Sequence, residues 1–385
     1  MPSNAPRNTD LWIHSRLMGD VDFKPIDIYY RSIPYLRLLT GIILFPCEGL
    51  QCNTRIMQSL ILVMVLVCLS IHAQAELTVH FLGTGGPEIT KDRQGVATLI
   101  EVPGNKFLFD AGRGVLQRMG ESRINLPAVK NVFFTHLHSD HIEGLPSLWM
   151  TSWFITKRND PMHFWGPAGT QTMIDGLHAF MSHDVVARVN PVVKPSGIRT
   201  RVTEVAEGVV FRDDTVRITA IPAEHGDGNP ALGYLFEYQG RSILLTGDST
   251  YTPVFGKWVK QVDIAVCNVY APSLALLENL DEYEEPIPTV VRAVSKKLAS
   301  PEQAAQLFIE TGAKIGVFTH NIFYDSTAED IKERVRNAGF SGKVHIAADR
   351  EYVILGKQIR FHPAEPVADD LEINSLNFKS VLKNN

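Results

Sequence analysis

The chain has 385 residues and a mass of 42.9 kDa, and 45% of its residues are hydrophobic, with 28 glycines and 22 prolines. This composition is typical of a globular protein and excludes a wholly disordered, collagen-like or multi-span membrane protein. The 37 basic and 42 acidic side chains give a formal net charge of -5. The chain therefore lacks the excess of Lys and Arg that would indicate a nucleic-acid partner.

An apolar run near the N-terminus is the first distinctive segment. Residues 59–71 read SLILVMVLVCLSI without a charge, and Ala73-Gln74-Ala75 follows. Such a run before a small-x-small site is typical of a secretory signal peptide, and it is shorter than a membrane span of about 20 residues. We therefore expect a mis-called N-terminal extension at 1–56, a signal peptide at 57–75 that starts at Met57, and a mature domain at 76–385.

Cleavage after Ala75 would release a periplasmic or secreted protein without a stable membrane span, and an internal signal anchor is the alternative. Of the four cysteines, only Cys267 would remain in the mature chain. An intramolecular disulfide is then excluded. The stability of the mature chain has to come from a hydrophobic core, which a chain of this length can bury.

The first half of the mature chain is rich in strand patterns that are separated by turn residues. Helices are expected at 112–120 and 170–181. Alternating or continuous apolar residues predict strands at 76–84, 96–102, 105–110, 130–136 and 161–169. A Gly-rich turn at 83–87 joins the first two strands, and it lacks the Gly-Lys-Ser/Thr ending of a phosphate-binding loop.

The second half repeats this order of strands followed by helices. Strands are predicted at 202–211, 216–225, 232–248, 262–269, 314–320, 343–349 and 351–361, with a hairpin turn at Gln239-Gly240. One helix is predicted at 300–312, where Ser300 is the N-cap and Pro301 the first residue, and another at 326–337. The acidic segment 273–297 is expected to be a surface excursion. The pattern predicts an α/β fold with two packed sheets and helices outside.

A cluster of metal-binding residue types follows the strand at 130–136. The segment Thr135-His136-Leu137-His138-Ser139-Asp140-His141 holds four of them. His136 and His138 project to the same side of extended backbone, and the following turn brings Asp140 and His141 to a second point. Imidazole and carboxylate are ligands for zinc and similar divalent ions. A solvated His-rich loop is the alternative interpretation.

This HxHxDH motif resembles the signature of the metallo-beta-lactamase superfamily, and His225, Asp248 and His320 follow in the expected order over residues 77–361. The resemblance implies a four-layer αβ/βα sandwich with two divalent metal ions, which we expect to be Zn2+. It implies one metal at His136, His138 and His225, another at Asp140, His141 and His320, and Asp248 as the bridge. Asp110 would support the cluster without binding metal.

Two metals about 3.5 to 4 Å apart can share a hydroxide and hold the attacking and leaving oxygens of a hydrolysis. Asp140, the expected catalytic residue, would orient that hydroxide. The strings FLGTGGP, THLHSDHIEGLPSL, WGPAG and HGDGNPALGYLFE resemble the ribonuclease Z branch. That branch includes phosphodiesterases and exported arylsulfatase-type enzymes.

The chain departs from the tRNA-processing members in two ways. Residues 226–247 leave no room for a tRNA-binding arm between the third His and the bridging Asp. Asn268 and Leu298 stand where those members carry a Glu and a His that assist the leaving group. General acid assistance is worth about a hundred- to ten-thousandfold, so these departures favour esters whose leaving group needs little protonation.

We therefore expect an exported metal-dependent hydrolase of small ester substrates such as aryl sulfates or phosphodiesters. The alternatives are a ribonuclease Z-type phosphodiesterase acting on RNA, a lactonase, or a non-catalytic metal-binding protein. The oligomeric state stays open, with a homodimer as one option. Four residues could replace the missing proton donors, although surface or packing roles are favoured for each. These candidates are His183, Tyr270, Lys297 and Tyr324.

Trp149 and Trp153 are spaced like one stripe of a helix just beyond the metal motif. Large aromatic residues in such a stripe are mostly core residues. A wall of an apolar substrate pocket is the second interpretation. The histidines at 80, 163, 178, 345 and 362 stand without partner motifs, and we interpret them as structural.

The expected start and cleavage site predict the N-terminus of the purified protein. Mass spectrometry should find a mature chain that begins at Glu76, because the small residues Ala73 and Ala75 suit signal peptidase. A peptide from a position before Met57 would contradict the expected mis-start.

Overall fold

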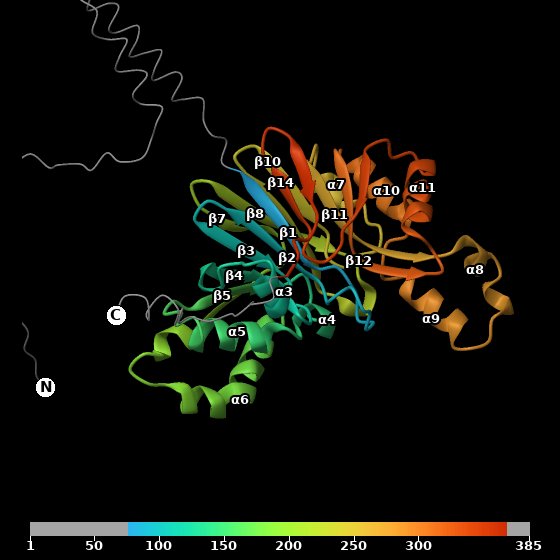
Figure 1. Cartoon of the computed structure of the whole chain (residues 1–385). Helices are drawn as coiled ribbons and strands as arrows, with labels where there is room; N and C mark the ends of the chain where they lie inside the picture. The colour runs from blue at the N-terminus through green and yellow to red at the C-terminus, as the bar shows by residue number, and fades with distance from the viewer. Residues whose placement is uncertain (1–75, 368–385) are drawn as a thin grey trace, which may run out of the picture. The chain divides into compact units, whose positions relative to one another are not determined.

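A computed structural model describes residues 76–367 of the chain (Figure 1). The expected extension at 1–56 and the expected signal peptide at 57–75 lie outside the described residues. Within the described part, no helix has the length and apolar character that a bilayer crossing requires.

The first sheet contains eight strands in the order β15-β14-β1-β2-β3-β4-β5-β6. The strands from β15 to β3 pair antiparallel, whereas β3, β4, β5 and β6 run parallel. The bounds are β1 Leu77–Gly83, β2 Ala97–Val102, β3 Asn105–Phe109, β4 Val129–Phe133, β5 Met162–Gly166, β6 Thr200–Glu204, β14 Tyr352–Leu355 and β15 Ile359–His362.

The second sheet contains seven strands in the order β13-β12-β11-β10-β9-β8-β7. The strands from β7 to β10 pair antiparallel, and β10 to β13 run parallel. The bounds are β7 Gly208–Arg212, β8 Val216–Ala223, β9 Ala231–Tyr238, β10 Arg241–Leu245, β11 Ile264–Pro272, β12 Ile315–Tyr324 and β13 Lys343–Ile346.

Helices cover the outer face of each sheet. Those on the first sheet are α3 Val115–Glu121, α5 Leu145–Phe154 and α6 Thr170–Arg188, and those on the second are α7 Val254–Trp258, α10 Pro301–Glu310 and α11 Ala328–Asn337. The one-turn helix α4 Ser139–Ile142 belongs to the metal motif, and α8 Leu274–Glu278 and α9 Ile287–Val294 form the excursion that projects beside β12 in Figure 1.

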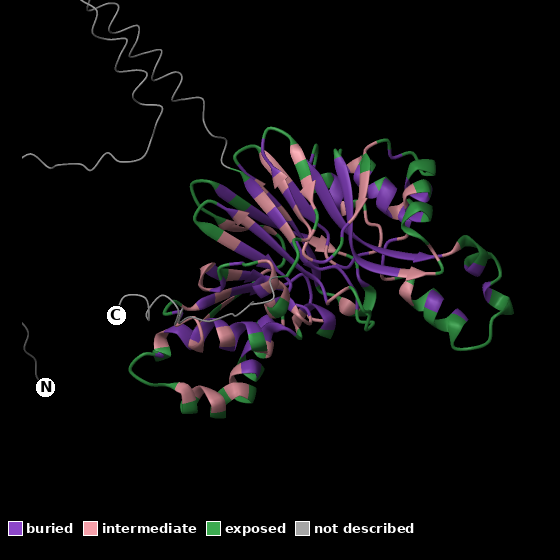
Figure 2. Cartoon of the chain, in the orientation of Figure 1, coloured by how far each residue is buried: buried purple, intermediate pink, exposed green. Residues whose placement is uncertain are grey.

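Three apolar clusters separate these layers. One fills the space between the sheets, where Phe109, Phe133 and Tyr234 pack together. The other two lie between each sheet and its own helices. Figure 2 shows the buried strands inside and the exposed residues concentrated on the helices and turns. This confirms the α/β, four-layer αβ/βα sandwich expected from the sequence.

The prediction of one strand at 202–211 is wrong. The segment forms two strands, because the chain leaves β6 at the edge of the first sheet and enters β7 at the edge of the second. Gly208 begins β7 with φ 93, a value that only glycine adopts without strain. The apolar residues on either side hid this change of sheet.

Trp149 and Trp153 lie in the core and do not wall a substrate pocket. Both side chains are fully buried in the cluster beneath α5. Their indole N–H groups donate to the carbonyls of Ile198 and Lys194 at 3.1 and 2.8 Å. The core interpretation of this helical stripe is therefore confirmed.

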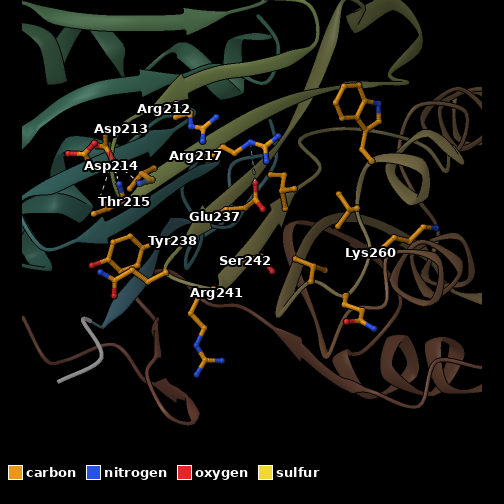
Figure 3. Close-up of a pocket in the computed structure, with 18 residues that line it drawn as sticks. Arg212, Asp213, Asp214, Thr215, Arg217, Glu237, Tyr238, Arg241, Ser242 and Lys260 are labelled. Carbon is orange, nitrogen blue, oxygen red and sulfur yellow. Dashed lines mark hydrogen bonds and ion pairs between the residues drawn. The ribbon is translucent and has the colours of Figure 1, made fainter. Parts of the chain in front are cut away.

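A cavity of about 420 Å3 opens at the end of the second sheet where β8 and β10 begin (Figure 3). Arg217, Glu237 and Lys260 are among the residues that line it. The expected metal ligands follow the opposite, carboxyl ends of these strands. This cavity therefore has no place in the metal chemistry.

The cap of α10 gives a test of the fold. Ser300 Oγ accepts from Gln303 N, and Gln303 Oε1 accepts from Ser300 N at 2.9 Å, which confirms the expected N-cap. Ser300→Ala should lower the free energy of unfolding by about 1 kcal/mol, measured by denaturant titration. Ser300→Asp keeps an acceptor and should lose less, and equal losses in both variants would contradict the capping role.

Candidate metal centre

The expected ligands meet at one edge of the two sheets. His136 and His138 follow β4, and α4 carries Asp140 and His141. The second sheet contributes side chains from three strands, with His225 after β8, Asp248 after β10 and His320 within β12. The structure brings all seven predicted residues into two adjoining clusters.

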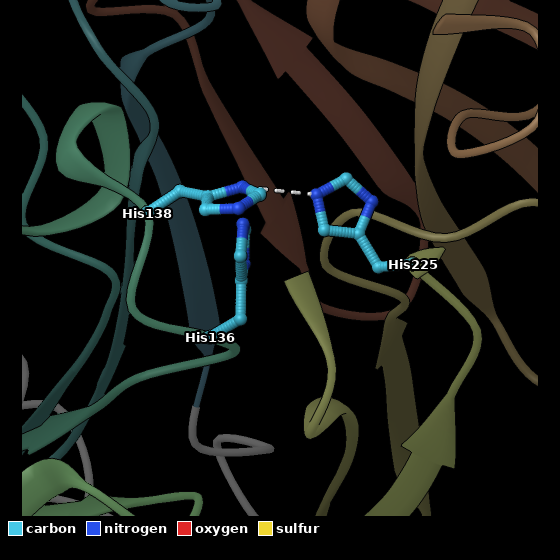
Figure 4. A group of neighbouring side chains, drawn as sticks. All are labelled: His136, His138 and His225. Carbon is cyan, nitrogen blue, oxygen red and sulfur yellow. Dashed lines mark hydrogen bonds between the residues drawn. The ribbon is translucent and has the colours of Figure 1, made fainter. Parts of the chain in front are cut away.

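The first cluster contains His136, His138 and His225, whose candidate ligand atoms lie within 4.8 Å of one another. His225 Nε2 lies 3.1 Å from His138 Nδ1 (Figure 4). His225 Nδ1 lies 3.0 Å from the main-chain oxygen of Lys297 and donates to it. A neutral His225 therefore presents the lone pair of Nε2 to the centre of the cluster.

The second cluster contains Asp140, His141, Asp248 and His320, all of them buried. His320 Nε2 lies 3.1 Å from Asp140 Oδ2 and 3.1 Å from Asp248 Oδ2. His141 Nε2 lies 3.5 Å from each of the same two carboxylate atoms. Two carboxylates and two imidazoles thus face one small volume.

Asp110 contacts this cluster through His141 and Thr135, as the family resemblance implied. Its carboxylate accepts from Thr135 N at 2.8 Å and from Thr135 Oγ1 at 2.9 Å. It also lies 2.8 Å from His141 Nδ1. Because Nδ1 donates to Asp110, the other ring nitrogen of His141 is left to face the cluster.

Several buried polar atoms of the centre have no hydrogen-bond partner in the structure. They are His136 Nε2, His141 Nε2, Asp248 Oδ1 and His320 Nδ1. Burying a polar atom without a partner costs free energy, and His141 Nε2, one of these atoms, faces the carboxylates of Asp140 and Asp248 at 3.5 Å. Such a donor set fits a divalent cation.

The charged groups of the centre shift one another's pKa values in different directions. Burial opposes ionisation of Asp248, but the imidazoles of His320 and His141 outweigh it and hold the pKa of this carboxyl well below its ordinary value. Burial opposes protonation of His141, yet Asp248 and Asp110 raise its pKa well above the ordinary value. Burial and the neighbouring His141 lower the pKa of His136, which favours the neutral, ligating form.

His320 occupies a strained position that no sequence pattern indicated. The pairing of β11 with β12 shifts register between Asn268 and Val269, and His320 falls at the shift with φ 46. A bulge of this kind turns a side chain out of the regular alternation of a strand. Here it directs the imidazole towards Asp140 and Asp248. Strain at such a position persists only where surrounding contacts enforce it.

The two departures seen in the sequence have clear structural counterparts. Asn268 is buried, and its side-chain oxygen accepts from Ser249 N at 3.1 Å, beside Asp248. Leu298 packs in an apolar cluster with Tyr270 and Ile322. Neither side chain can donate a proton to a leaving group in the way that a Glu or a His would.

Residues 226–247 form a compact hairpin. The two-residue turn Gln239-Gly240 joins β9 to β10, and both residues have positive φ, 45 and 77. This geometry is typical of a tight type I′ turn. The expected absence of an arm between His225 and Asp248 is confirmed.

Of the candidate proton donors, His183 is exposed on α6, away from both clusters. The Tyr270 hydroxyl is buried without a partner, and burial raises its pKa. Tyr324 Oη lies 3.5 Å from Glu88 Oε1.

The sequence analysis missed that the main chain of Lys297 orients His225, because a backbone contact leaves no signature in residue type.

The chain matches the sequence profile of the Beta-lactamase superfamily domain over residues 105–321. The chain belongs to the metallo-beta-lactamase superfamily. This superfamily member is 31% identical over 251 residues to a protein named ribonuclease Z from Mycolicibacterium gilvum (strain PYR-GCK), covering 64% of this chain and 84% of that protein. The predicted superfamily and its ribonuclease Z-like branch are therefore confirmed.

Two solved structures show the same fold. The metallo-beta-lactamase fold protein YhfI from Bacillus subtilis aligns with a TM-score of 0.56 and 14% identity, over 73% of this chain and 100% of that one. The short form of human tRNase Z aligns with a TM-score of 0.52 and 22% identity, over 71% of this chain and 98% of that one. At these identities the likeness supports the fold alone.

The contact between Asp110 and His141 predicts a loss of metal affinity. Asp110→Asn removes the carboxylate that orients His141, so zinc affinity should fall by about 10- to 100-fold, measured by competition with a chromophoric chelator. Asp214→Asn, an exposed change at the turn between β7 and β8, should leave the affinity unchanged. Equal affinity in the two variants would contradict the supporting role of Asp110.

Proposed function

We propose that this superfamily hydrolase is a divalent-metal-dependent phosphodiesterase. The observation that carries the proposal is the meeting of all seven ligand-type side chains in two adjoining clusters. The similarity to ribonuclease Z of Mycolicibacterium gilvum supports the phosphodiester bond as the bond that is cleaved.

We propose that His136, His138 and His225 hold one ion and that Asp140, His141 and His320 hold the other. Asp248 would bridge them, because its Oδ2 atom lies 3.7 Å from His225 Nε2 and 3.1 Å from His320 Nε2. One carboxylate oxygen thus reaches both clusters. Zinc is the proposed metal, since imidazole and carboxylate ligands suit it.

When bound, the ions would polarise the phosphoryl oxygen and make a nucleophile available at neutral pH. The protein supplies the proton acceptor. Burial opposes ionisation of Asp140, but its hydrogen bond with His320 and the charge of His141 outweigh it and lower the pKa of this carboxyl. An ionised Asp140 beside the cluster can orient the attacking water, which is the catalytic role expected for it, and can also accept the proton of that water.

The substrate is proposed to be a phosphodiester with a good leaving group. Asn268 and Leu298 leave the cleaved oxygen without the usual proton donors, so the leaving group has to depart with little protonation. Export, which rests on residues 57–75 outside the described part of the chain, stays a prediction. Hydrolysis of aryl sulfates, hydrolysis of lactones and a non-catalytic metal-binding role also stay predictions.

RNA is the second candidate substrate. The relative from Mycolicibacterium gilvum and another from Mycobacterium marinum are both named ribonuclease Z, and this name favours RNA. The same name weakens our expectation that nucleic acid is not a partner. The compact β9–β10 hairpin and the net charge of -5 favour a small substrate instead. A substrate panel therefore has to include both kinds of phosphodiester.

The test is a substrate panel on the metal-loaded chain. Bis(p-nitrophenyl) phosphate should be hydrolysed, and chelation of the metal should abolish the reaction. A short RNA with a 3′ trailer, p-nitrophenyl sulfate and a lactone complete the panel. Preferred cleavage of the RNA would support the second candidate, and turnover of the sulfate or the lactone alone would contradict a phosphodiesterase.

Asp140→Ala tests the proton acceptor. Turnover of bis(p-nitrophenyl) phosphate should fall by about a hundred- to ten-thousandfold, and Asp214→Asn should keep full activity. Metal content, measured by mass spectrometry, has to accompany both variants. If metal-loaded protein hydrolyses none of the panel and Asp140→Ala changes nothing, the chain is a metal-binding protein without catalysis. Fewer than two metals per chain would contradict only the dinuclear site.

A further inference from the structure

Lys297 lies beside the first cluster, and its side chain has no role in the chemistry described so far. Its main-chain oxygen accepts from His225 Nδ1 at 3.0 Å. Its ammonium donates to Asp227 Oδ2 at 2.7 Å. A Cβ placed on Gly226 would lie 3.5 Å from Lys297 Cγ, so the stem of the side chain passes across this glycine. The side chain is therefore held along the turn that follows His225.

That turn packs directly on the histidines of the cluster. A Cβ on Gly228 would lie 2.8 Å from Cε1 of His138 and 2.1 Å from Cδ2 of His225. Asp227, the partner of the Lys297 ammonium, lies in this same turn, two residues after His225. The Lys297 ammonium is thus a cation at the edge of the His136, His138 and His225 cluster.

The Lys297 ammonium is accessible to solvent, and its ion pair with Asp227 is weak. The Lys297 side chain is 33% exposed and that of Asp227 is 67% exposed. Ion pairs in such positions contribute little to stability, so an incoming anion can share the ammonium or take it from Asp227. A Lys ammonium is a point charge that suits phosphate oxygens.

We propose that the Lys297 ammonium binds a non-bridging oxygen of the substrate at the first cluster and thereby selects anionic esters over neutral ones. This inference rests on the proposed phosphodiesterase function and names a specificity residue for it. Lys297 stands next to Leu298, so the chain carries a cation one residue away from the position of the missing His.

Two esters with the same leaving group separate this role from a structural one. Bis(p-nitrophenyl) phosphate is an anion, whereas p-nitrophenyl acetate is neutral, and both release p-nitrophenol. Lys297→Gln should lower kcat/KM for the phosphodiester by about ten- to a hundredfold, the range for a lost hydrogen bond to a charged group. Hydrolysis of the acetate should stay within about twofold, because the main-chain contact with His225 is kept.

Matched variants complete the test. Lys296→Gln removes an exposed neighbouring charge and should change neither reaction, and Lys297→Arg should restore part of the phosphodiester activity. Asp227→Asn frees the ammonium, so it should lower KM for bis(p-nitrophenyl) phosphate and should have no such effect when combined with Lys297→Gln. Equal losses on the two esters, or no loss on the phosphodiester, would overturn the inference.

Binding of inorganic phosphate gives a readout that does not depend on turnover. Calorimetric titration of the metal-loaded full chain should show about tenfold weaker phosphate binding for Lys297→Gln than for Lys296→Gln. If the unaltered protein hydrolyses neither ester, the proposed function fails while weakened phosphate binding still supports the anion site. Unchanged phosphate binding would overturn the anion site whatever the protein hydrolyses.

Discussion

The arrangement of the centre depends on one buried carboxylate, that of Asp248. It lies between imidazoles from both sheets, and the neighbouring His320 and His141 outweigh the cost of its burial and hold its pKa well below the ordinary value. Asp110 then holds His141 in place from the first sheet. The two halves of the sandwich are thereby joined electrostatically at the edge where the chemistry is expected.

The HxHxDH motif and its resemblance to the metallo-beta-lactamase superfamily located the site in the sequence. His136, His138, Asp140 and His141 are adjacent in the chain, and each remaining ligand is associated with an apolar strand that the residue pattern predicts. Strands of one sandwich that end at the same edge bring their next residues together. The α10 cap could be predicted from the local order Ser300-Pro301, and the supporting place of Asp110 from the family resemblance.

Other features depended on contacts that residue types do not encode. The chain changes sheets between β6 and β7 with apolar residues on both sides, so the break at Gly208 looked like part of one strand. The register shift that turns His320 into the centre arises from the pairing of β11 with β12. The orientation of His225 depends on a backbone oxygen, which any residue would supply.

The backbone contact at position 297 has an evolutionary consequence. Because the main-chain carbonyl of Lys297 orients His225, the side chain at position 297 can change without disturbing His225. A substitution can thus alter the charge at the mouth of the centre while the metal geometry is conserved. Under the specificity role proposed for Lys297, single substitutions at position 297 would change substrate preference and leave the proposed metal ligands in place.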